Sequence, residues 1–216
     1  MIDRLKTSNV LNHIILCTST NPQDKPLVDI AAIEDIDCFR GSEEDVILRL
    51  YEASRKFKLD YALNVTADCP LVSIEYIEKI MDKYKETNAD FIRCMNLPHG
   101  FYSWGLKIDA MKKVCEIKKS NETEVWGRYF TDTALFNVVD IDVPAEYRRD
   151  YRLTLDYPDD FEFFKNIFKH FGTNTYKASM SDIIKYLDAN PQVVEINTHC
   201  EHMYRERYDS QNKLEV

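Results

Sequence analysis

The stretch Tyr61-Ala-Leu-Asn-Val-Thr-Ala-Asp68-Cys-Pro70-Leu71 decides the fold class, because an apolar run of β type ends in one carboxylate and then a proline. This pattern predicts a buried strand that carries Asp68 to the edge of a sheet. In open α/β sheets ligands bind beyond the carboxyl ends of the strands, where an aspartate meets a cation or a phosphate. Asp68 is therefore the first candidate functional residue.

The same arrangement returns at Arg152-Leu-Thr-Leu-Asp156-Tyr-Pro158-Asp159-Asp160. Again an apolar strand-like run ends in an aspartate, a proline follows two residues later, and a helix comes next. The repetition predicts that Asp68 and Asp156 form two halves of one metal site. The alternative is that each aspartate only caps the turn or helix that follows it, and Asp159 or Asp160 is then able to replace Asp156.

Composition limits the class of protein. The chain has 216 residues, of which 44% are hydrophobic, enough for one domain with a sizeable core. The net charge of −9 and the lack of a long basic block disfavour nucleic-acid binding. No apolar run approaches the roughly 20 residues that span a bilayer, and the N-terminus lacks a signal-peptide pattern. A protein without membrane association is therefore expected.

The six cysteines show no CxxC spacing that would indicate a zinc or redox site. Most of them lie in or beside apolar strand-like runs, where free cysteine behaves as a small hydrophobic residue. Reduced structural thiols in a cytoplasmic protein are expected, because cytosolic proteins rarely use disulfides.

Hydrophobic periodicity alternates between strand and helix along the chain. Strands are expected at 13–19, 37–40, 61–68, 90–95, 102–108 and 136–143, and helices at 1–12, 26–34, 46–53, 73–86, 110–118, 125–135, 159–168 and 181–188. Successive strand and helix units predict an α/β fold with a mainly parallel, doubly wound sheet. The domain is expected to cover residues 1–200, followed by a loose charged tail over 201–216.

Three blocks of the sequence together resemble one family. These are Phe39-Arg-Gly-Ser-Glu-Glu-Asp-Val46, Asn64-Val-Thr-Ala-Asp-Cys-Pro-Leu71 and Arg152-Leu-Thr-Leu-Asp-Tyr-Pro-Asp-Asp-Phe161. In this order they resemble the cytidylyltransferases of the spore coat polysaccharide type, relatives of CMP-sialic acid and CMP-Kdo synthetases. The resemblance implies a Rossmann-like nucleotidyltransferase fold that joins a nucleoside triphosphate, CTP first of all, to a sugar hydroxyl for surface glycan synthesis and releases pyrophosphate.

The resemblance also implies roles for particular residues. Asp68 and Asp156 would coordinate Mg²⁺, which agrees with the need to neutralise charge in phosphoryl chemistry. The nucleotide-binding set is Thr18, Ser19, Arg40, Gly41, Ser42 and Asn64. Gly41 in this set allows close backbone approach and precedes a helix with free amides. The plainer reading is an ordinary glycine before a capped helix. No catalytic acid or base is assigned.

One family feature has no match in these residues. The relatives open with a central strand and a loop of the type RxxSxRLPxK that grips the triphosphate, whereas this sequence opens with the helix expected after that loop. A sheet without that strand would have a gap at its switch point and exposed apolar edges. An in-frame upstream segment of about 30 to 45 residues is the favoured expectation, and loss of the phosphate grip is the alternative.

The candidate substrate-binding residues lie between positions 99 and 152. They are His99, Glu124, Trp126, Arg128, Tyr129 and Arg152. Arginine pairs well with the carboxylate or phosphate of an anionic sugar. Against this role, Trp126 and Phe130 at positions i and i+4 are equally expected of a core helix.

Two other function classes stay open. A glycosyltransferase of similar α/β architecture would carry a metal-binding DxD motif, and Asp140-Ile-Asp142 has that pattern. A catalytically inert, truncated relative is the other class. His199 and His202 are a weak zinc candidate because no second ligand cluster is evident. The sequence leaves the oligomeric state open, with a homodimer as one expectation.

Overall fold

The structure is a computed structural model that describes residues 1–211. Its main sheet contains β3 (Tyr61–Asn64), β5 (Trp104–Lys107), β4 (Phe91–Met95) and β6 (Val138–Asp142), in this order across the sheet. Strand β4 pairs with β6 in parallel, whereas β5 runs antiparallel to both of its neighbours. Strands β3, β4 and β6 therefore run in one direction and β5 runs against them, so the sheet is mainly parallel, as expected, with one antiparallel strand among the described residues.

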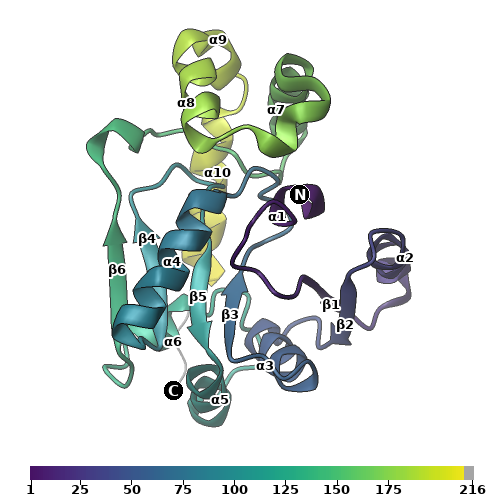
Figure 1. Ribbon diagram of the computed structural model, residues 1–216, viewed down its shortest axis with the longest axis vertical. Coiled ribbons are helices and arrows are strands. Elements are labelled where there is room, and N and C mark those ends of the chain that lie inside the picture. The colour runs from purple at the N-terminus through teal and green to yellow at the C-terminus, as the bar shows by residue number, and fades with distance from the viewer. Residues whose placement is uncertain (212–216) are drawn as a thin grey trace.

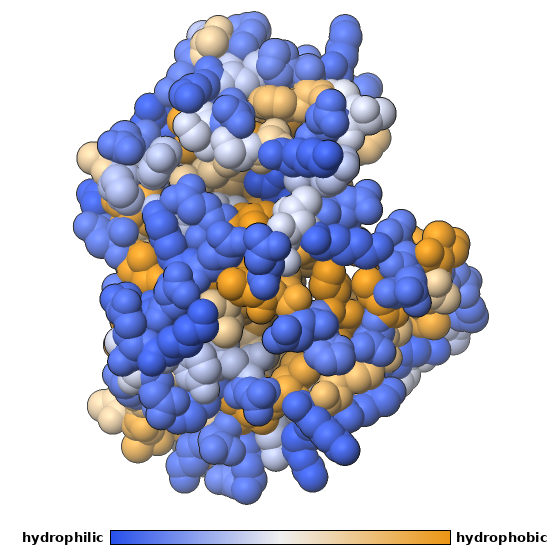
Figure 2. Space-filling view, viewed as in Figure 1, coloured by the Kyte–Doolittle hydropathy of each residue, from blue (hydrophilic) through white to orange (hydrophobic). Residues whose placement is uncertain are grey.

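A second, two-stranded sheet contains β1 (Ile15–Ser19) and β2 (Asp37–Gly41), which pair in parallel. Strand hydrogen bonds do not join the two sheets within residues 1–211. Figure 1 shows β1 and β2 beyond β3, and Figure 2 shows apolar side chains at the surface between the two sheets. All four residues of β3 are only half-buried. The outer edges of β1 and β3 thus lack a strand partner in the part of the chain that the structure describes.

Helices account for most of the remaining chain (Figure 1). The α-helices are α1 Ile2–Leu5, α2 Lys25–Ile33, α3 Val46–Lys56, α4 Ile74–Thr87, α5 Ile108–Ile117, α6 Gly127–Thr131, α7 Pro158–Phe171, α8 Met180–Ala189, α9 Pro191–Val194 and α10 Thr198–Gln211. Short 3₁₀ helices are η1 Pro22–Asp24, η2 Ala145–Tyr147 and η3 Gly172–Lys177. Helices α3 and α4 begin at their capping residues, because the side chains of Asp45 and Ser73 each accept a backbone N–H of the first turn.

Successive side chains of a strand point to opposite faces of the sheet, and here they pack into two separate cores. In β4, Phe91 packs with helices α3, α5 and α6, and the next residue, Ile92, packs with α4, α7 and α8. Val138 and Val139 of β6 divide in the same way. The main sheet is therefore the middle layer of an α/β sandwich, and the α/β class predicted from the sequence is confirmed.

Several expected elements are shorter than predicted. Strand β3 ends at Asn64, so the segment to Asp68 is a loop. Residues 152–156 form no strand, and only an isolated bridge pairs His99 with Arg152. The helices expected at 1–12 and 125–135 shrink to α1 and α6.

The expected loose tail is wrong for residues 201–211, which belong to helix α10. This helix runs back along the main sheet and contacts the loops that carry His99 and Arg152 (Figure 1). The rest of the expected tail, 212–216, lies outside the described residues. None of the helices within residues 1–211 combines the length and apolar composition that a bilayer crossing requires.

Candidate active site

Two loops bring the predicted aspartates to one place. The backbone N–H of Leu155 donates to the carbonyl oxygen of Asp68 at 2.9 Å, so the loop after β3 lies against the segment that ends in Asp156. The pKa of Tyr204 is raised, mainly by burial. The negative charges of Asp156 and Asp68 raise this pKa further, so both carboxylates lie within electrostatic range of the Tyr204 hydroxyl. The two aspartates therefore face the same region, although neither ends a strand.

The Asp68 carboxylate has an unusual environment. Its Oδ1 atom is buried and has no hydrogen-bond partner among the described residues. A buried carboxylate oxygen without a donor is costly unless a cation or a ligand satisfies it. The environment of Asp68 is therefore compatible with the metal role predicted for it, which stays a prediction.

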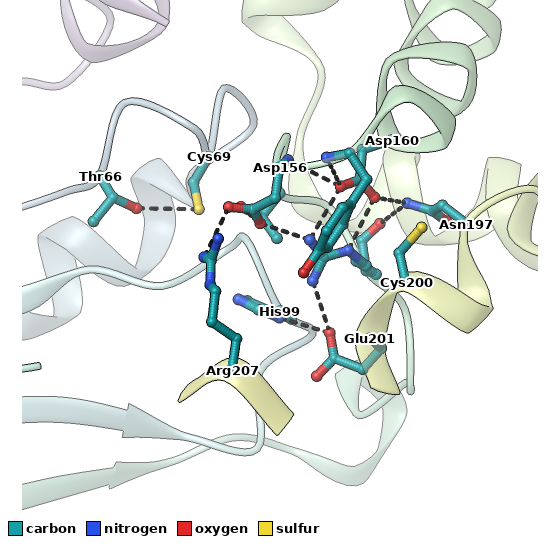
Figure 3. A network of polar contacts seen from close by, with 12 residues as sticks. Thr66, Cys69, His99, Asp156, Asp160, Asn197, Cys200, Glu201 and Arg207 are labelled. Atoms are coloured by element: carbon teal, nitrogen blue, oxygen red, sulfur yellow. Dashed lines mark hydrogen bonds and ion pairs between the residues drawn. The ribbon is translucent and has the colours of Figure 1, made fainter. Parts of the chain in front are cut away.

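Asp156 is held from both sides. Its Oδ2 atom accepts hydrogen bonds from Arg152 Nη2 at 2.6 Å and Thr154 Oγ1 at 3.3 Å. Its Oδ1 atom lies 3.5 Å from the guanidinium of Arg207 on α10. Figure 3 shows Arg207 reaching from α10 toward this carboxylate.

Arg152 is buried beneath the site and paired with acids. Its guanidinium donates to both oxygens of Asp160, at 2.9 and 3.0 Å. Asp160 also accepts the backbone N–H groups of Asp156 and Tyr157 and the amide of Asn197 (Figure 3). Burial opposes the charge of Asp160, but these hydrogen bonds outweigh it and lower its pKa. Arg152 is only 2% exposed and orients Asp156, and the direct contact with substrate predicted for it stays a prediction.

Helix α10 covers this network. Glu201 Oε2 lies 2.8 Å from His99 Nδ1 and accepts from Arg152 Nη1 at 3.2 Å. Burial opposes ionisation of Glu201, yet the hydrogen bonds from His99, Arg205 and Arg152 lower its pKa to about 2. The Tyr204 ring lies 4.7 Å from the His99 ring and 5.3 Å from the Arg152 guanidinium. His99 therefore lies in the same network as Arg152, with its Nδ1 atom held by Glu201, and its substrate-binding role stays a prediction.

The predicted nucleotide-binding residues gather on the two-stranded sheet. Asp24 accepts hydrogen bonds from the hydroxyls of Thr18 and Ser19 at 2.8 and 2.6 Å, and Arg40 donates to the carbonyl oxygen of Ser19 at 2.9 Å. Ser42 Oγ accepts the backbone N–H of Asp45 at 3.1 Å. These bonds shape the loops at the carboxyl ends of β1 and β2, and the nucleotide role stays a prediction.

Gly41 and Asn64 are explained in part by packing. A side chain at Gly41 would meet the ring of Phe39 at 2.8 Å and the side chain of Arg49 at 2.9 Å. Asn64 is the last residue of β3 and pairs with Trp104 in the ladder. Their roles toward a nucleotide also stay predictions.

The expected acceptor pocket around residues 124–129 is not an open pocket. Trp126 and Tyr129 are buried, and Trp126 packs edge-on against the rings of Phe91, Trp104 and Phe130. The core alternative, which concerned Trp126 and Phe130, is therefore correct for both, since Phe130 is buried as well. Arg128 pairs with Asp132 on the surface, and Glu124 is exposed.

Both aspartates of the Asp140-Ile-Asp142 motif have structural partners. Asp140 receives two hydrogen bonds from Arg93 on the neighbouring strand, and Asp142 pairs with Arg148. These contacts occupy the Asp140-Ile-Asp142 motif that a glycosyltransferase would need for a metal.

The residues that could form a zinc site differ from the predicted pair of His199 and His202. His202 pairs with Glu206, whereas His199 and Cys200 come within 4.8 Å of Asp159 through their possible ligand atoms. These three residues lie in the first turns of α7 and α10. The partial positive charge of two helix N-termini disfavours a cation there.

The residues that sequence reasoning missed are Asp160 as an anchor, Asn197, Glu201, Tyr204 and Arg207. Asp160 carried a local signal, since it is the third residue of α7 and its side chain accepts backbone N–H groups at the helix start. The residues of α10 gave none, because the helix has charged and aromatic residues without a clear apolar face and was read as tail.

An α/β sheet covered by helices on both faces, with two loop carboxylates that face one region, is an architecture typical of nucleotide-binding enzymes of the Rossmann-like class. The sequence model described as cytidylyltransferase matches residues 1–214, and this chain belongs to that family. It is therefore a nucleotidyltransferase that acts with a nucleoside triphosphate.

Two relatives are similar to most of this chain. An uncharacterized protein of Methanocaldococcus jannaschii is 32% identical over 210 residues, covering 95% of this chain and 86% of the relative. The spore coat polysaccharide biosynthesis protein SpsF of Bacillus subtilis is 25% identical over 185 residues, covering 83% of this chain and 76% of the relative.

Two solved structures share the fold. A cytidylyltransferase from Leptospira borgpetersenii superimposes with a TM-score of 0.82 at 22% identity, over 90% of this chain and 83% of that one. A CMP:2-keto-3-deoxy-manno-octonic acid synthetase complexed with CTP gives a TM-score of 0.57 at 10% identity, over 78% of this chain and 86% of that one.

Proposed function

We propose that this protein transfers a cytidylyl group from CTP to a sugar hydroxyl and so makes an activated CMP-sugar for a surface polysaccharide. The observation that carries the proposal is the buried, unpartnered Oδ1 of Asp68, in a loop hydrogen-bonded to the segment that ends in Asp156, in a chain of the cytidylyltransferase family. The names of the spore coat relative and of the CTP-bound structure neighbour support the choice of product and of nucleotide.

The donor set suits Mg²⁺. Two carboxylates that face one region leave coordination positions for phosphate oxygens and water, which is how Mg²⁺ is commonly bound with nucleotides. Asp68 offers Oδ1 without a competing donor, and Asp156 offers the oxygen that faces Arg207. Bound there, the ion would neutralise negative charge on the triphosphate.

In the proposed reaction the sugar hydroxyl oxygen forms a bond to the α-phosphorus of CTP. The bond from that phosphorus to the oxygen bridging the β-phosphate breaks, pyrophosphate leaves with the bonding pair, and the hydroxyl proton passes to water. The protein contributes mainly by positioning and charge. Arg152 and Asp160 fix Asp156, and the cluster of Thr18, Ser19 and Arg40 is the proposed nucleotide side of the site.

A pyrophosphate-release assay tests the proposal. The purified chain is given each of CTP, UTP, GTP and ATP with Mg²⁺ and a panel of neutral and acidic sugars, and products are identified by mass spectrometry. Asp68→Asn should lower turnover about 100-fold or more, as loss of a charge-stabilising group does. Asp82→Asn on the exposed surface of α4 is the matched control.

The outcome that contradicts the proposal is equally clear. Turnover of Asp68→Asn equal to that of the unaltered chain, with both proteins folded by circular dichroism, would remove the metal assignment. Activity only with an already activated sugar would favour the glycosyltransferase class.

The proposal also covers the cellular location and the assembly of the protein. All six cysteines are free thiols, which suits a reducing cytoplasm where CTP is made. A homodimer is the proposed assembly, and light scattering after size exclusion measures it.

A further inference from the structure

Helix α10 places the guanidinium of Arg207 where the proposed metal ion would bind. Arg207 faces Asp156 Oδ1 at 3.5 Å, and the other oxygen of Asp156 is held by Arg152 (Figure 3). The Oδ1 atom of Asp68, in the loop that is hydrogen-bonded to Leu155, has no hydrogen-bond partner among the described residues. The carboxylate oxygen of Asp156 that remains for a metal is therefore the one that Arg207 faces.

The two side chains differ in their freedom. Arg152 is 1% exposed at its side chain and is fixed by Asp156, Asp160 and Glu201. The side chain of Arg207 is 46% exposed, and its pair with Asp156 is longer. A long and partly exposed arginine can move without a large packing cost, whereas the buried one cannot.

The helix itself has separate anchors. Glu201 holds His99 and Arg152, and the Tyr204 ring packs on His99. These contacts are made by the first half of α10, so the helix can stay docked while the Arg207 side chain leaves Asp156.

Electrostatics sets the direction of that movement. A divalent cation between Asp68 and Asp156 would compete with Arg207 for the same carboxylate and repel its guanidinium. A nucleotide bound to that cation would bring phosphate oxygens, and arginine pairs with phosphate through two parallel hydrogen bonds. A bound nucleotide would therefore give the guanidinium, which also lies over the Tyr204 ring, phosphate oxygens to pair with in place of Asp156.

We propose that Arg207 is a positioning residue that exchanges partners, holding Asp156 when the metal is absent and a nucleotide phosphate when metal and nucleotide are bound. This inference rests on the proposed function of the same site. Its consequence is that Arg207 weakens binding of the metal alone and strengthens binding of the metal with nucleotide.

The test compares Arg207→Met with Arg205→Met, which removes the same charge from the same helix at a side chain that is 73% exposed and pairs with Glu201. Binding of Mn²⁺ alone is measured from the free-ion signal in electron paramagnetic resonance. Binding of CTP in the presence of Mn²⁺ is measured by isothermal titration. Arg207→Met should bind Mn²⁺ about five-fold more tightly and CTP about ten-fold more weakly, while Arg205→Met changes each by less than about two-fold.

The opposite signs of the two effects identify the exchange. Arg207→Lys, which keeps the charge, should stay close to the unaltered chain in Mn²⁺ binding and answers any folding defect of the methionine variant. If Arg207→Met changes both affinities in the same direction, or leaves Mn²⁺ binding unchanged, the exchange is excluded. If Asp68→Asn binds Mn²⁺ as well as the unaltered chain, the metal site of the proposed function fails, and the exchange fails with it.

Discussion

Gly100 shows how one residue fixes the geometry of the site. Its φ of +102° lies in the region that favours glycine, and a Cβ there would lie 2.1 Å from the carbonyl oxygen of Leu153. On either side, His99 N–H donates to Tyr151 at 3.1 Å and Leu153 N–H donates to His99 at 2.6 Å. The absence of a side chain at Gly100 lets the loop of His99 lie directly against the segment that leads to Asp156.

We therefore expect Gly100→Ala to lower the free energy of unfolding by about 3 kcal/mol or more, from backbone strain and the clash with Leu153. Gly127→Ala is the matched control, because its Cβ would meet nothing within 4 Å and its φ is not positive. That control should stay within about 1 kcal/mol of the unaltered chain. Chemical denaturation measures both, and equal stability of the two variants would contradict the role given to Gly100.

At the scale of the element, α10 is the largest difference between expectation and structure. Its charged residues predicted a loose tail, yet Glu201 makes ion pairs with groups from two other parts of the chain. The information for this docking is not local, because the partners His99 and Arg152 are distant in sequence. Helix α4, by contrast, was predicted closely, since its Ser73 cap and apolar face are both local signals.

The stability that comes from the docking of α10 should depend on pH in the acidic range. The folded-state pKa of Glu201 is about 2, below its usual value of 4.5, because the hydrogen bonds from His99, Arg205 and Arg152 outweigh burial. A lowered folded-state pKa contributes stability that is present above pH 4.5 and is lost as pH falls from 4.5 toward 2.

We expect the free energy of unfolding of Glu201→Gln to be lower than that of the unaltered chain at neutral pH. Between pH 4.5 and 2 it should fall less than that of the unaltered chain. Urea denaturation at a series of pH values measures the difference. Glu206→Gln, exposed on the same helix, serves as the control. If the free energy of unfolding depends on pH in the same way for Glu201→Gln and the unaltered chain, the Glu201 charge does not hold the helix.

At the scale of the whole molecule, the two sheets are the main feature. Within residues 1–211, β1 and β3 each have a strand partner on one side only. Strand β3 is half-buried throughout, while β4 is mostly buried. An unpaired strand edge leaves backbone N–H groups without ladder bonds.

Hydrogen exchange should detect these edges. Amides of β1 and β3 that point away from β2 and β5 should exchange much faster than those of the central strands β4 and β5. Measurement by nuclear magnetic resonance resolves single residues. Uniform protection across β1 and β3 would show instead that another strand covers both edges in solution.

The sequence by itself determined the α/β class, the strand and helix order through α5, the family blocks and the choice of Asp68 and Asp156. These features follow from periodicity, caps and short motifs, which act over a few residues. Only the tertiary structure decided that Trp126 and Tyr129 belong to the core, that Arg152 is held by Asp160, and that α10 brings Arg207 to Asp156. Burial and ion pairing at these positions depend on which distant segments meet, and no local pattern in the chain encodes that meeting.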